Sequence, residues 1–444
     1  MNTPICDFVK NYIASSAERM HMPGHKGLPL LGFEPFDITE IKGADSLYEA
    51  DGIIAQSEKN ATDIFGTKST FYSAEGSSLC IRAMLFLAVR HAKQNGKNPL
   101  ILAGRNAHKT FITASALIDF ETEWLPTVED TGYLTAETDL GEAERMIAEK
   151  QPAAVYITSP DYLGHVADIK SLSLICRKHG VLLLVDNAHG AYLKFLPESL
   201  HPIDLGADIC CDSAHKTLPV LTGGAYLHIS KNAPDFFTSE AKNALSVFGS
   251  TSPSYLILQS LDAANAYLSD GYREKLTEFA GVSEKMKNRI SSLGFELYGD
   301  EPLKITVKPK SYGYSGNDLA DEMRGRGIEC EFSDPDYTVF MLSPERGAEG
   351  LGKLASALSS IKKKTAINSR PPVAALPERV MSPREAMLMP CEKIPSSLSE
   401  GRVLAALNVG CPPAVPIAVC GEKISKSVAE MFEYYGIDNC DVIK

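Results

Sequence analysis

"CCDSAHKTLPVLTGGAYLHI", residues Cys210–Ile229, joins an apolar run to a polar segment in which Lys216 follows a serine and a histidine and precedes two glycines. A lysine on the surface needs no such neighbours. A lysine that forms a covalent bond does, because burial or a nearby cation must lower its pKa before it becomes a nucleophile at neutral pH. Lys216 is therefore the first candidate catalytic residue, although a single lysine taken alone is more often an ordinary loop residue.

Short apolar runs before Lys216 predict the fold. They alternate with segments whose apolar residues recur at helical spacing, and they cover residues 100–104, 153–160, 181–186 and 207–213. Such alternation is typical of βαβ units around a buried parallel sheet. Ser159, Asp186 and Ser213 lie at the carboxyl ends of three of these runs, and open α/β sheets bind their ligands at that edge.

Composition changes along the chain and suggests a division into five parts. We expect an N-terminal arm at 1–55, a large ligand-binding domain at 56–281, a small α/β domain at 282–366, a proline-rich linker at 367–385 and a C-terminal domain at 386–444. The expected fold class is α/β, with a mostly parallel central sheet between helices and smaller α+β domains after it.

The overall composition is that of a globular protein and narrows the classes of partner. The chain has 444 residues, 44% of them hydrophobic, and a net charge of −12, which argues against a nucleic-acid partner. No run reaches the length of a membrane span, and the N-terminus does not resemble a secretory signal. The ten cysteines are scattered, which indicates reduced thiols. We therefore expect a cytoplasmic protein with neither a membrane nor a nucleic acid as its partner.

Asp186 and Lys216 together indicate a particular cofactor. An aspartate that closes the apolar run "VLLLVD" is costly without a partner, although a helix cap is the ordinary alternative. Lys216 follows 30 positions later, after the next apolar run. Pyridoxal phosphate needs a lysine that binds its aldehyde as a Schiff base and an acid that keeps its pyridine nitrogen protonated. The pair therefore predicts a pyridoxal phosphate site.

Further residues are candidates for the phosphate and the ring of this cofactor. Gly76, Ser77 and Ser78 open a predicted helix, where free backbone N–H groups and the helix dipole favour an anion. The Ser213 hydroxyl is a further phosphate donor, and the ring of His108 is a candidate to stack on the cofactor. Taken alone, these residues would be an ordinary helix cap and an ordinary core histidine.

A metal site is the competing interpretation of His21 and His25. The two histidines are four residues apart, which on a helix would suit a metal ion. Pro23 and Gly24 lie between them and interrupt a helix. We therefore expect a loop there and no metal.

Several motifs in order make the chain resemble the bacterial ornithine/lysine/arginine decarboxylases of the aspartate aminotransferase fold, in their short form. The stretches that carry the resemblance are "HMPGHKG", "DITEIKGADSLYEADGII", "RNAHKT", "DNAHGAYLKF", "GADICCDSAHKTLPVLTGGAYLH", "STSPSYLILQSLD" and "CPPAVPIAVCGEKI". The resemblance implies a fold type I pyridoxal phosphate enzyme that decarboxylates a basic amino acid, most often arginine, then lysine or ornithine, in polyamine biosynthesis.

The resemblance also implies roles for single residues. Lys216 would hold the cofactor, Asp186 would pair with the pyridine nitrogen, and His215 would place the lysine and the substrate carboxylate. The cofactor contacts would come from His108, His189, Ser77, Ser78 and Ser213, and from Thr251 and Ser252, which would reach the phosphate of a neighbouring subunit in an obligatory homodimer. Asp45, Glu49 and Glu422 are the candidate acids for the distal cationic group of the substrate.

Three positions depart from the family pattern. The family usually has Asp-Glu-Ala-His where this chain has Asn187 after Asp186; Glu75 stands before the glycine of the phosphate turn; and Cys411 replaces a usual tyrosine. Two other functions stay open on the sequence: another fold type I enzyme, such as an aminotransferase or a carbon–sulfur lyase, and a non-catalytic relative that binds the cofactor.

Overall fold

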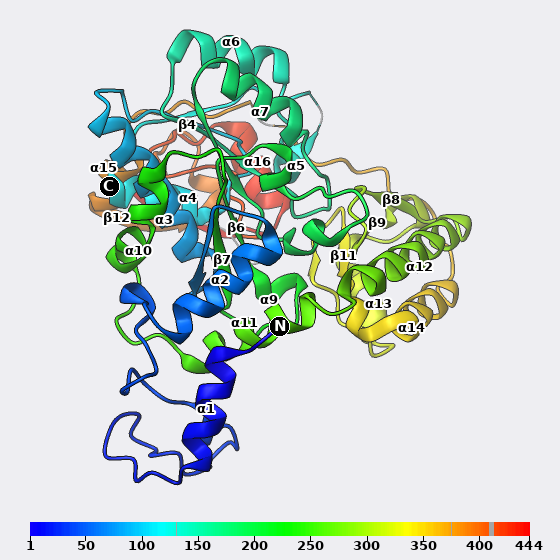
Figure 1. Ribbon diagram of the computed structural model, residues 1–444. Helices are drawn as coiled ribbons and strands as arrows, with labels where there is room; N and C mark the ends of the chain where they lie inside the picture. The colour runs from blue at the N-terminus through cyan, green and yellow to red at the C-terminus, as the bar shows by residue number, and fades with distance from the viewer. Residues whose placement is uncertain (130, 374, 408–412) are drawn as a thin grey trace. The chain divides into compact units, whose positions relative to one another are not determined.

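The computed structural model describes residues 1–129, 131–373, 375–407 and 413–444. Contacts between residues divide the chain into two units. Figure 1 labels the helices and strands of the chain and colours them by residue number. Unit 1 comprises 1–99, 150–159 and 168–276, and unit 2 comprises 100–149, 160–167 and 277–444. Each unit is described by itself, and the five-part division expected from composition stays a prediction.

Unit 1 is built on five adjacent strands in the order β1-β7-β6-β5-β4. The strands are β1 (Ser69–Ser73), β4 (Ala154–Thr158), β5 (Leu182–Asp186), β6 (Ile209–Asp212) and β7 (Ala225–Ile229). β4, β5 and β6 pair in parallel, whereas β7 is antiparallel to both β6 and β1. Four of the five strands therefore run in one direction, which confirms the predicted mostly parallel α/β sheet.

Helices cover these strands in unit 1. They are α1 (Pro4–Ala14), α2 (Ile53–Phe65), α3 (Gly76–Gln94), α7 (Ile169–Lys178), α8 (Pro202–Leu205), α9 (Ala214–Thr217), α10 (Asp235–Phe248) and α11 (Tyr255–Leu268). α3 packs against β5, β6 and β7, and α10 packs against α3. Every residue of β6 and β7 is buried, as the continuous apolar runs of a covered sheet require.

Unit 2 contains a parallel strand pair, a four-stranded antiparallel sheet and a two-stranded antiparallel sheet. Its strands are β2 (Ile101–Ala103), β3 (Thr122–Trp124), β8 (Glu296–Tyr298), β9 (Lys304–Lys308), β10 (Phe332–Ser333), β11 (Thr338–Met341), β12 (Cys391–Pro395) and β13 (Asn439–Ile443). The four-stranded sheet has the order β10-β11-β9-β8.

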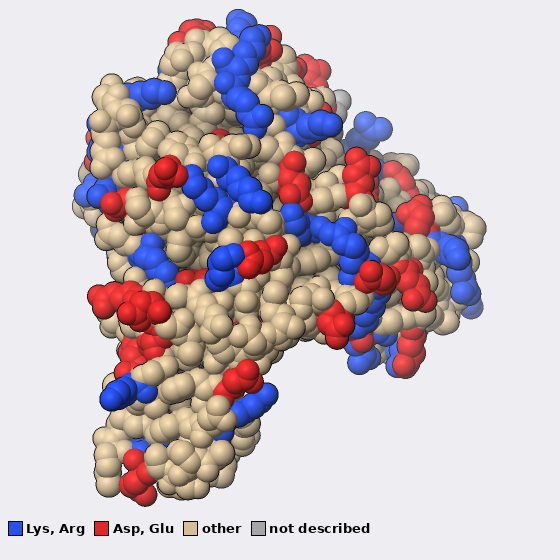
Figure 2. Space-filling view, in the orientation of Figure 1, with Lys and Arg blue, Asp and Glu red and all other residues tan. Residues whose placement is uncertain are grey.

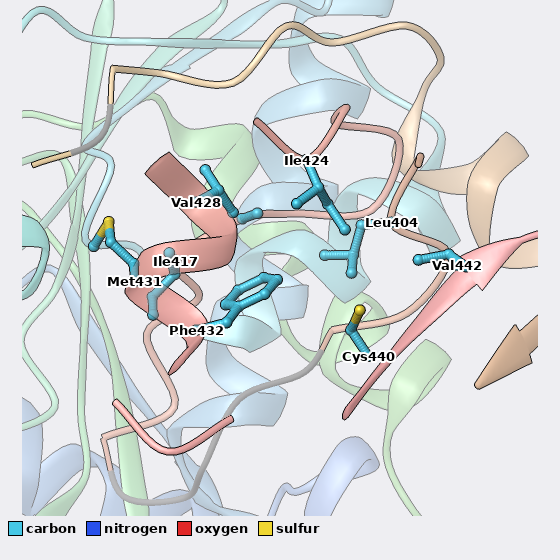
Figure 3. Packing of buried hydrophobic residues seen from close by; sticks show 9 residues of the cluster. Leu404, Ile417, Ile424, Val428, Met431, Phe432, Cys440 and Val442 are labelled. Carbon is cyan, nitrogen blue, oxygen red and sulfur yellow. The ribbon is translucent and has the colours of Figure 1, made fainter. Parts of the chain in front are cut away.

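The helices of unit 2 flank these sheets. They are α4 (Lys109–Ile118), α5 (Gly132–Thr135), α6 (Leu140–Lys150), α12 (Tyr272–Ser292), α13 (Gly316–Arg324), α14 (Gly347–Ser359), α15 (Pro383–Leu388) and α16 (Lys426–Tyr434); α6 and α12 each extend slightly into unit 1. α16 is anchored by Val428, Met431 and Phe432, which point into an apolar cluster with Leu404 and Val442 (Figure 3).

The visible surface carries charges of both signs, and the described cysteines are unpaired. Acidic and basic side chains are interspersed over the visible face (Figure 2), so the excess of acid does not gather there into one patch. Nine cysteines lie in the described segments and all of them are free thiols; Cys411 lies outside those segments. Within the same segments, no helix combines the length and the apolar character that crossing a membrane requires.

Candidate active site

Lys216 and His189 are brought together in unit 1. Lys216 lies on α9, the single helical turn that follows β6, and His189 lies in the segment that follows β5. The Lys216 Nζ atom is 3.1 Å from the His189 Nε2 atom. The imidazole is buried, with 4% of its surface exposed. A proton can therefore pass directly between the amine and the ring.

Asp186 lies fully buried at the end of β5, and its carboxylate has mainly neutral donors. The Tyr156 hydroxyl donates to Oδ2 at 3.1 Å, and the Ala188 backbone N–H donates to Oδ1 at 3.2 Å. Burial raises the pKa of Asp186, and the positive charge of Lys216 opposes that rise. The ionised carboxylate thus lies where a further cation would stabilise it.

The turn that opens α3 joins two of the predicted phosphate residues. The Ser213 hydroxyl donates to the Ser77 hydroxyl at 2.6 Å, and both residues are buried. Gly76 adopts a φ of 71°, and its backbone N–H donates to the Gly223 carbonyl at 2.7 Å. Ser78 is half-buried in the next position of α3. Two hydroxyls therefore lie at the N-terminus of a 19-residue helix, where its dipole favours an anion.

The Glu75 carboxylate accepts a hydrogen bond from a loop of the same chain. The Ser250 backbone N–H donates to Glu75 Oε1 at 2.5 Å. Thr251 and Ser252, next in that loop, are exposed. The acid that departs from the family pattern therefore holds this loop beside the phosphate turn, and the role of Thr251 and Ser252 towards a neighbouring subunit stays a prediction.

The remaining two predicted histidines have different surroundings. His215 donates from Nδ1–H to the Gly224 carbonyl at 3.0 Å, and burial lowers its pKa, so the ring is neutral at pH 7. His108 belongs to unit 2, where it caps α4 by accepting a hydrogen bond from the Thr110 backbone N–H at 3.2 Å. Its stacking role stays a prediction.

Asn187 joins a buried polar network that the sequence did not reveal. Its Nδ2 atom donates to Asp212 Oδ1 at 2.7 Å. His201 and His228 each contact Asp212 Oδ2 through Nε2 at 3.1 Å. Burial opposes the ionisation of Asp212, but these two imidazoles hold its pKa well below the usual value. Asn187, in the segment that leads from Asp186 to His189, therefore donates an amide hydrogen bond to a buried carboxylate.

Two of the three acids suggested for the substrate cation accept hydrogen bonds within their own unit. Asp45 accepts from the backbone N–H groups of Ser46 and Gly52 at 2.9 Å each. Glu422 accepts from the backbone N–H of Val419 at 2.8 Å, and the Arg105 guanidinium lies 3.4 Å away. Glu49 is exposed. The geometry thus favours structural roles for Asp45 and Glu422.

The donor set in unit 1 fits pyridoxal phosphate. It provides an amine on Lys216, a buried acid at Asp186 that a pyridinium nitrogen would stabilise, and two hydroxyls at a helix N-terminus. Tyr156 and Asp212 were not found from the sequence. Tyr156 lies inside an apolar strand and Asp212 ends one, and both therefore look like residues of the core. The position of Asp212 at the carboxyl end of β6 was the available signal for that residue.

Comparison with known proteins agrees with this geometry. The family model described as "Orn/Lys/Arg decarboxylase, major domain" matches residues 3–298. An arginine decarboxylase of Bacillus subtilis (strain 168) is 28% identical over 458 residues, covering 96% of this chain and 91% of that protein. An arginine decarboxylase of Halalkalibacterium halodurans is 27% identical over 462 residues, with 96% and 91% covered.

The solved structures show the fold. The constitutive lysine decarboxylase of E. coli superposes with a TM-score of 0.79 at 17% identity, over 100% of this chain and 82% of that chain. A NifS-like protein superposes with a TM-score of 0.55 over 69% of this chain. With a family model that matches well over half of its length, the chain belongs to the Orn/Lys/Arg decarboxylase family, a family of pyridoxal-phosphate-dependent amino-acid decarboxylases.

Proposed function

We propose that the protein decarboxylates a basic amino acid, arginine in the first place, to the corresponding amine and CO2, with pyridoxal phosphate bound at Lys216. The observation that carries the proposal is the contact of the Lys216 amine with His189 at 3.1 Å, together with the charge interaction between that amine and the buried Asp186. Arginine is favoured because the two relatives compared above are named arginine decarboxylases.

The residues divide the work between holding the cofactor and moving protons. Pyridoxal phosphate, when bound through its aldehyde, supplies an electron sink for the electron pair that the departing CO2 leaves behind. Lys216 would hold the aldehyde, and its amine can exchange a proton with His189 Nε2, 3.1 Å away. Asp186 holds a proton at the pyridine nitrogen. The hydroxyls of Ser77 and Ser213 bind the phosphate, helped by the dipole of α3.

The rest of the site orients the substrate. The bond from Cα to the carboxylate breaks and a proton takes its place at Cα, so the products are one amine and one CO2. His215 is held by the Gly224 carbonyl as a neutral ring with Nδ1 protonated, which leaves Nε2 to accept a hydrogen bond. We assign it the positioning of the lysine and the substrate. Orientation of this kind accounts for a large share of the barrier lowering in such sites.

Assembly and cellular role are also part of the proposal. We infer a homodimer in which Thr251 and Ser252 reach the partner's phosphate; both are exposed in the single chain, as residues that serve another subunit would be. A role in polyamine biosynthesis follows from the amine product. The expected cytoplasmic location stays a prediction.

Release of CO2 from arginine, lysine and ornithine by the purified holoenzyme tests the reaction. We expect release from at least one of the three, with arginine fastest. Formation of a keto acid in place of an amine would point to an aminotransferase. No turnover in a protein that shows the cofactor's visible absorbance would point to a non-catalytic relative.

Lys216→Ala tests the site itself. We expect loss of the visible absorbance of the lysine-bound cofactor. We also expect CO2 release to slow at least 1000-fold, which corresponds to about 4 kcal/mol of activation free energy. Lys231→Ala is the matched control, since Lys231 is an exposed lysine of the same unit. Turnover by Lys216→Ala at the wild-type rate would show that the assignment is wrong.

A further inference from the structure

Tyr156 carries a hydroxyl in the interior of the sheet of unit 1. It lies on β4 and is fully buried. A buried hydroxyl without a hydrogen bond costs free energy, and this one donates to Asp186 Oδ2 at 3.1 Å. Phenylalanine would fill the same place without needing any partner. The role of the hydroxyl is therefore to be sought at Asp186.

The pairing of the two strands fixes this contact. β4 and β5 run in parallel, and Tyr156 lies opposite Leu184, two residues before Asp186. Residues two apart in a strand point to the same face of the sheet, so the phenol and the carboxyl group share one face. Both residues are buried, and water therefore has little access to the hydrogen bond between them.

The other donors to Asp186 contact its second oxygen. The Ala188 backbone N–H donates to Oδ1 at 3.2 Å, and the Cys211 thiol donates to Oδ1 at 3.7 Å. Each oxygen of an ionised carboxylate can accept two hydrogen bonds. Among the residues that the structure describes, Oδ1 has two donors, whereas Oδ2 has the Tyr156 hydroxyl alone. The acceptor site that stays open for a ligand is thus on the oxygen that Tyr156 holds.

Tyr156 is a donor that keeps its proton. Burial raises the pKa of its phenol well above the usual value, and the charge of Asp186 adds to the rise. Burial also raises the pKa of the Asp186 carboxyl, while the charge of Lys216 and the hydrogen bond from Tyr156 oppose that rise. A hydrogen bond to a carboxylate stabilises its charge. Tyr156 therefore favours the ionised form of Asp186 without itself being charged.

Tyr226 shows that a buried tyrosine of this sheet can be satisfied without an acid. It lies on β7 opposite Asp212 and so points to the face away from Asp186. It is fully buried, and its hydroxyl donates to the Asn265 side-chain oxygen at 3.4 Å. The two tyrosines thus resemble each other in burial and differ in the group that they contact.

We propose that Tyr156 is a positioning residue that acts through Asp186: it holds Oδ2 and weakens the carboxylate as a base, so that the proton between Asp186 and the pyridine nitrogen of the cofactor stays on the nitrogen. A carboxylate that already accepts a hydrogen bond competes less well for a shared proton. The protonated ring is the form that accepts electrons. This inference rests on the proposed function, because it needs pyridoxal phosphate at Lys216 with its ring at Asp186.

Solid-state nitrogen-15 NMR of the holoenzyme, loaded with pyridoxal phosphate labelled at the ring nitrogen, tests the proposal. The resonance of this nitrogen distinguishes the protonated from the unprotonated ring, and free cofactor at low and high pH supplies the two reference positions. We expect the resonance of Tyr156→Phe to lie between those of the wild type and Asp186→Asn. An unchanged resonance in Tyr156→Phe, or a shift towards the protonated position, would overturn the assignment.

Two variants separate this role from a role in the fold. Tyr226→Phe also removes one buried hydroxyl from the sheet and should leave the resonance unchanged; a shift as large as that of Tyr156→Phe would refute the proposal. Tyr156→Phe combined with Asp186→Asn should show the resonance of Asp186→Asn alone, because Tyr156 acts through the acid. A further shift in the double variant would contradict this route.

Tyr156→Met guards against a variant that does not fold. It lacks the hydroxyl as well, and its flexible side chain fills irregular space, so it should move the resonance in the same direction as Tyr156→Phe. The Asp186→Asn spectrum separates the two levels of the argument. A resonance equal to that of the wild type would overturn both the role of Asp186 and this inference, whereas a shift there without one in Tyr156→Phe would overturn this inference alone.

Discussion

Asn187→Asp would place a second carboxylate against Asp212 and thereby test the buried network behind the active-site loop. The Asn187 amide donates to Asp212 Oδ1 at 2.7 Å. Two unit charges at that distance repel by about 6 kcal/mol at an effective dielectric constant of about 20. Divided by 1.36 kcal/mol per pKa unit, this repulsion would raise the pKa of the new aspartate by about four units, from about 3.9 to about 8.

The sign of the pH dependence follows from this shift. A carboxyl whose folded pKa is raised binds its proton more tightly in the native state, so the variant loses stability as pH rises from the unfolded towards the folded pKa. At low pH the new carboxyl is protonated and donates to Asp212 as the amide did. We expect a destabilisation relative to wild type of about 1.5 kcal/mol at pH 5 and about 5 kcal/mol at pH 8.

Urea unfolding at both pH values, followed by far-UV circular dichroism at saturating cofactor, measures the difference. Asn187→Ala removes the donor without adding a charge, and its cost should be the same at both pH values. Asn232→Asp makes the same chemical change at an exposed position of unit 1 and should stay within about 0.5 kcal/mol. An equal destabilisation of Asn187→Asp at pH 5 and pH 8 would refute the account of Asp212 as an ionised acid.

Three further changes test other parts of the structure. Burial raises the pKa of Asp334 to about 7, with Asp336 adding to the rise and Lys310 opposing it. Because the unfolded carboxyl, with a pKa of about 3.9, is already ionised at pH 5, Asp334→Asn should raise the melting temperature at both pH values and more at pH 8 than at pH 5; an equal shift at both would contradict this. A Cβ on Gly223 would lie 2.9 Å from the Ala74 carbonyl oxygen, so Gly223→Ala should weaken cofactor binding at least tenfold by fluorescence titration, unlike Gly271→Ala, where the Cβ meets open space. Ser77→Ala should weaken cofactor binding about tenfold, since a hydrogen bond to a charged group contributes about 1.5 kcal/mol or more; unchanged affinity would remove Ser77 from the phosphate site.

The sheet of unit 1 could be predicted because burial on both faces leaves a strong pattern. β5 and β6 are short apolar runs that end in an acid, and the chain must place that acid at the sheet edge, where a polar group finds partners. The helix that begins at Gly76 was predicted in the same way, from its small polar start and its apolar period. These local patterns were sufficient to predict that Lys216, Asp186 and Ser213 lie at the same edge of one sheet.

The partners of those residues could not be predicted, because they come from elements that are distant in sequence. Tyr156 lies 30 residues before Asp186, and only the parallel pairing of β4 with β5 brings the two together. Glu75 looked unfavourable beside a phosphate, and its bond to Ser250 depends on a loop 175 residues later. Asp45 looked like a substrate ligand, but five backbone N–H groups in the following ten residues donate to its carboxylate.

Asp186 and Asp212 show how neighbouring strands serve two purposes at one sheet edge. Asp186 pairs in register with Cys211, and successive side chains of a strand point to opposite faces, so Asp212 faces away from Asp186. Asp212 has an amide and two imidazoles and is satisfied within the chain. Asp186 has a phenol and one backbone N–H as its closest donors, and burial disfavours its charge. Asp212 thus has three polar partners within the chain, whereas Lys216 is the cation whose charge acts on Asp186, so Asp186 can accept a further cation from a ligand. Saturating pyridoxal phosphate should therefore raise the stability of the wild type more than that of Asp186→Asn, and an equal gain in both would show that Asp186 does not face the cofactor.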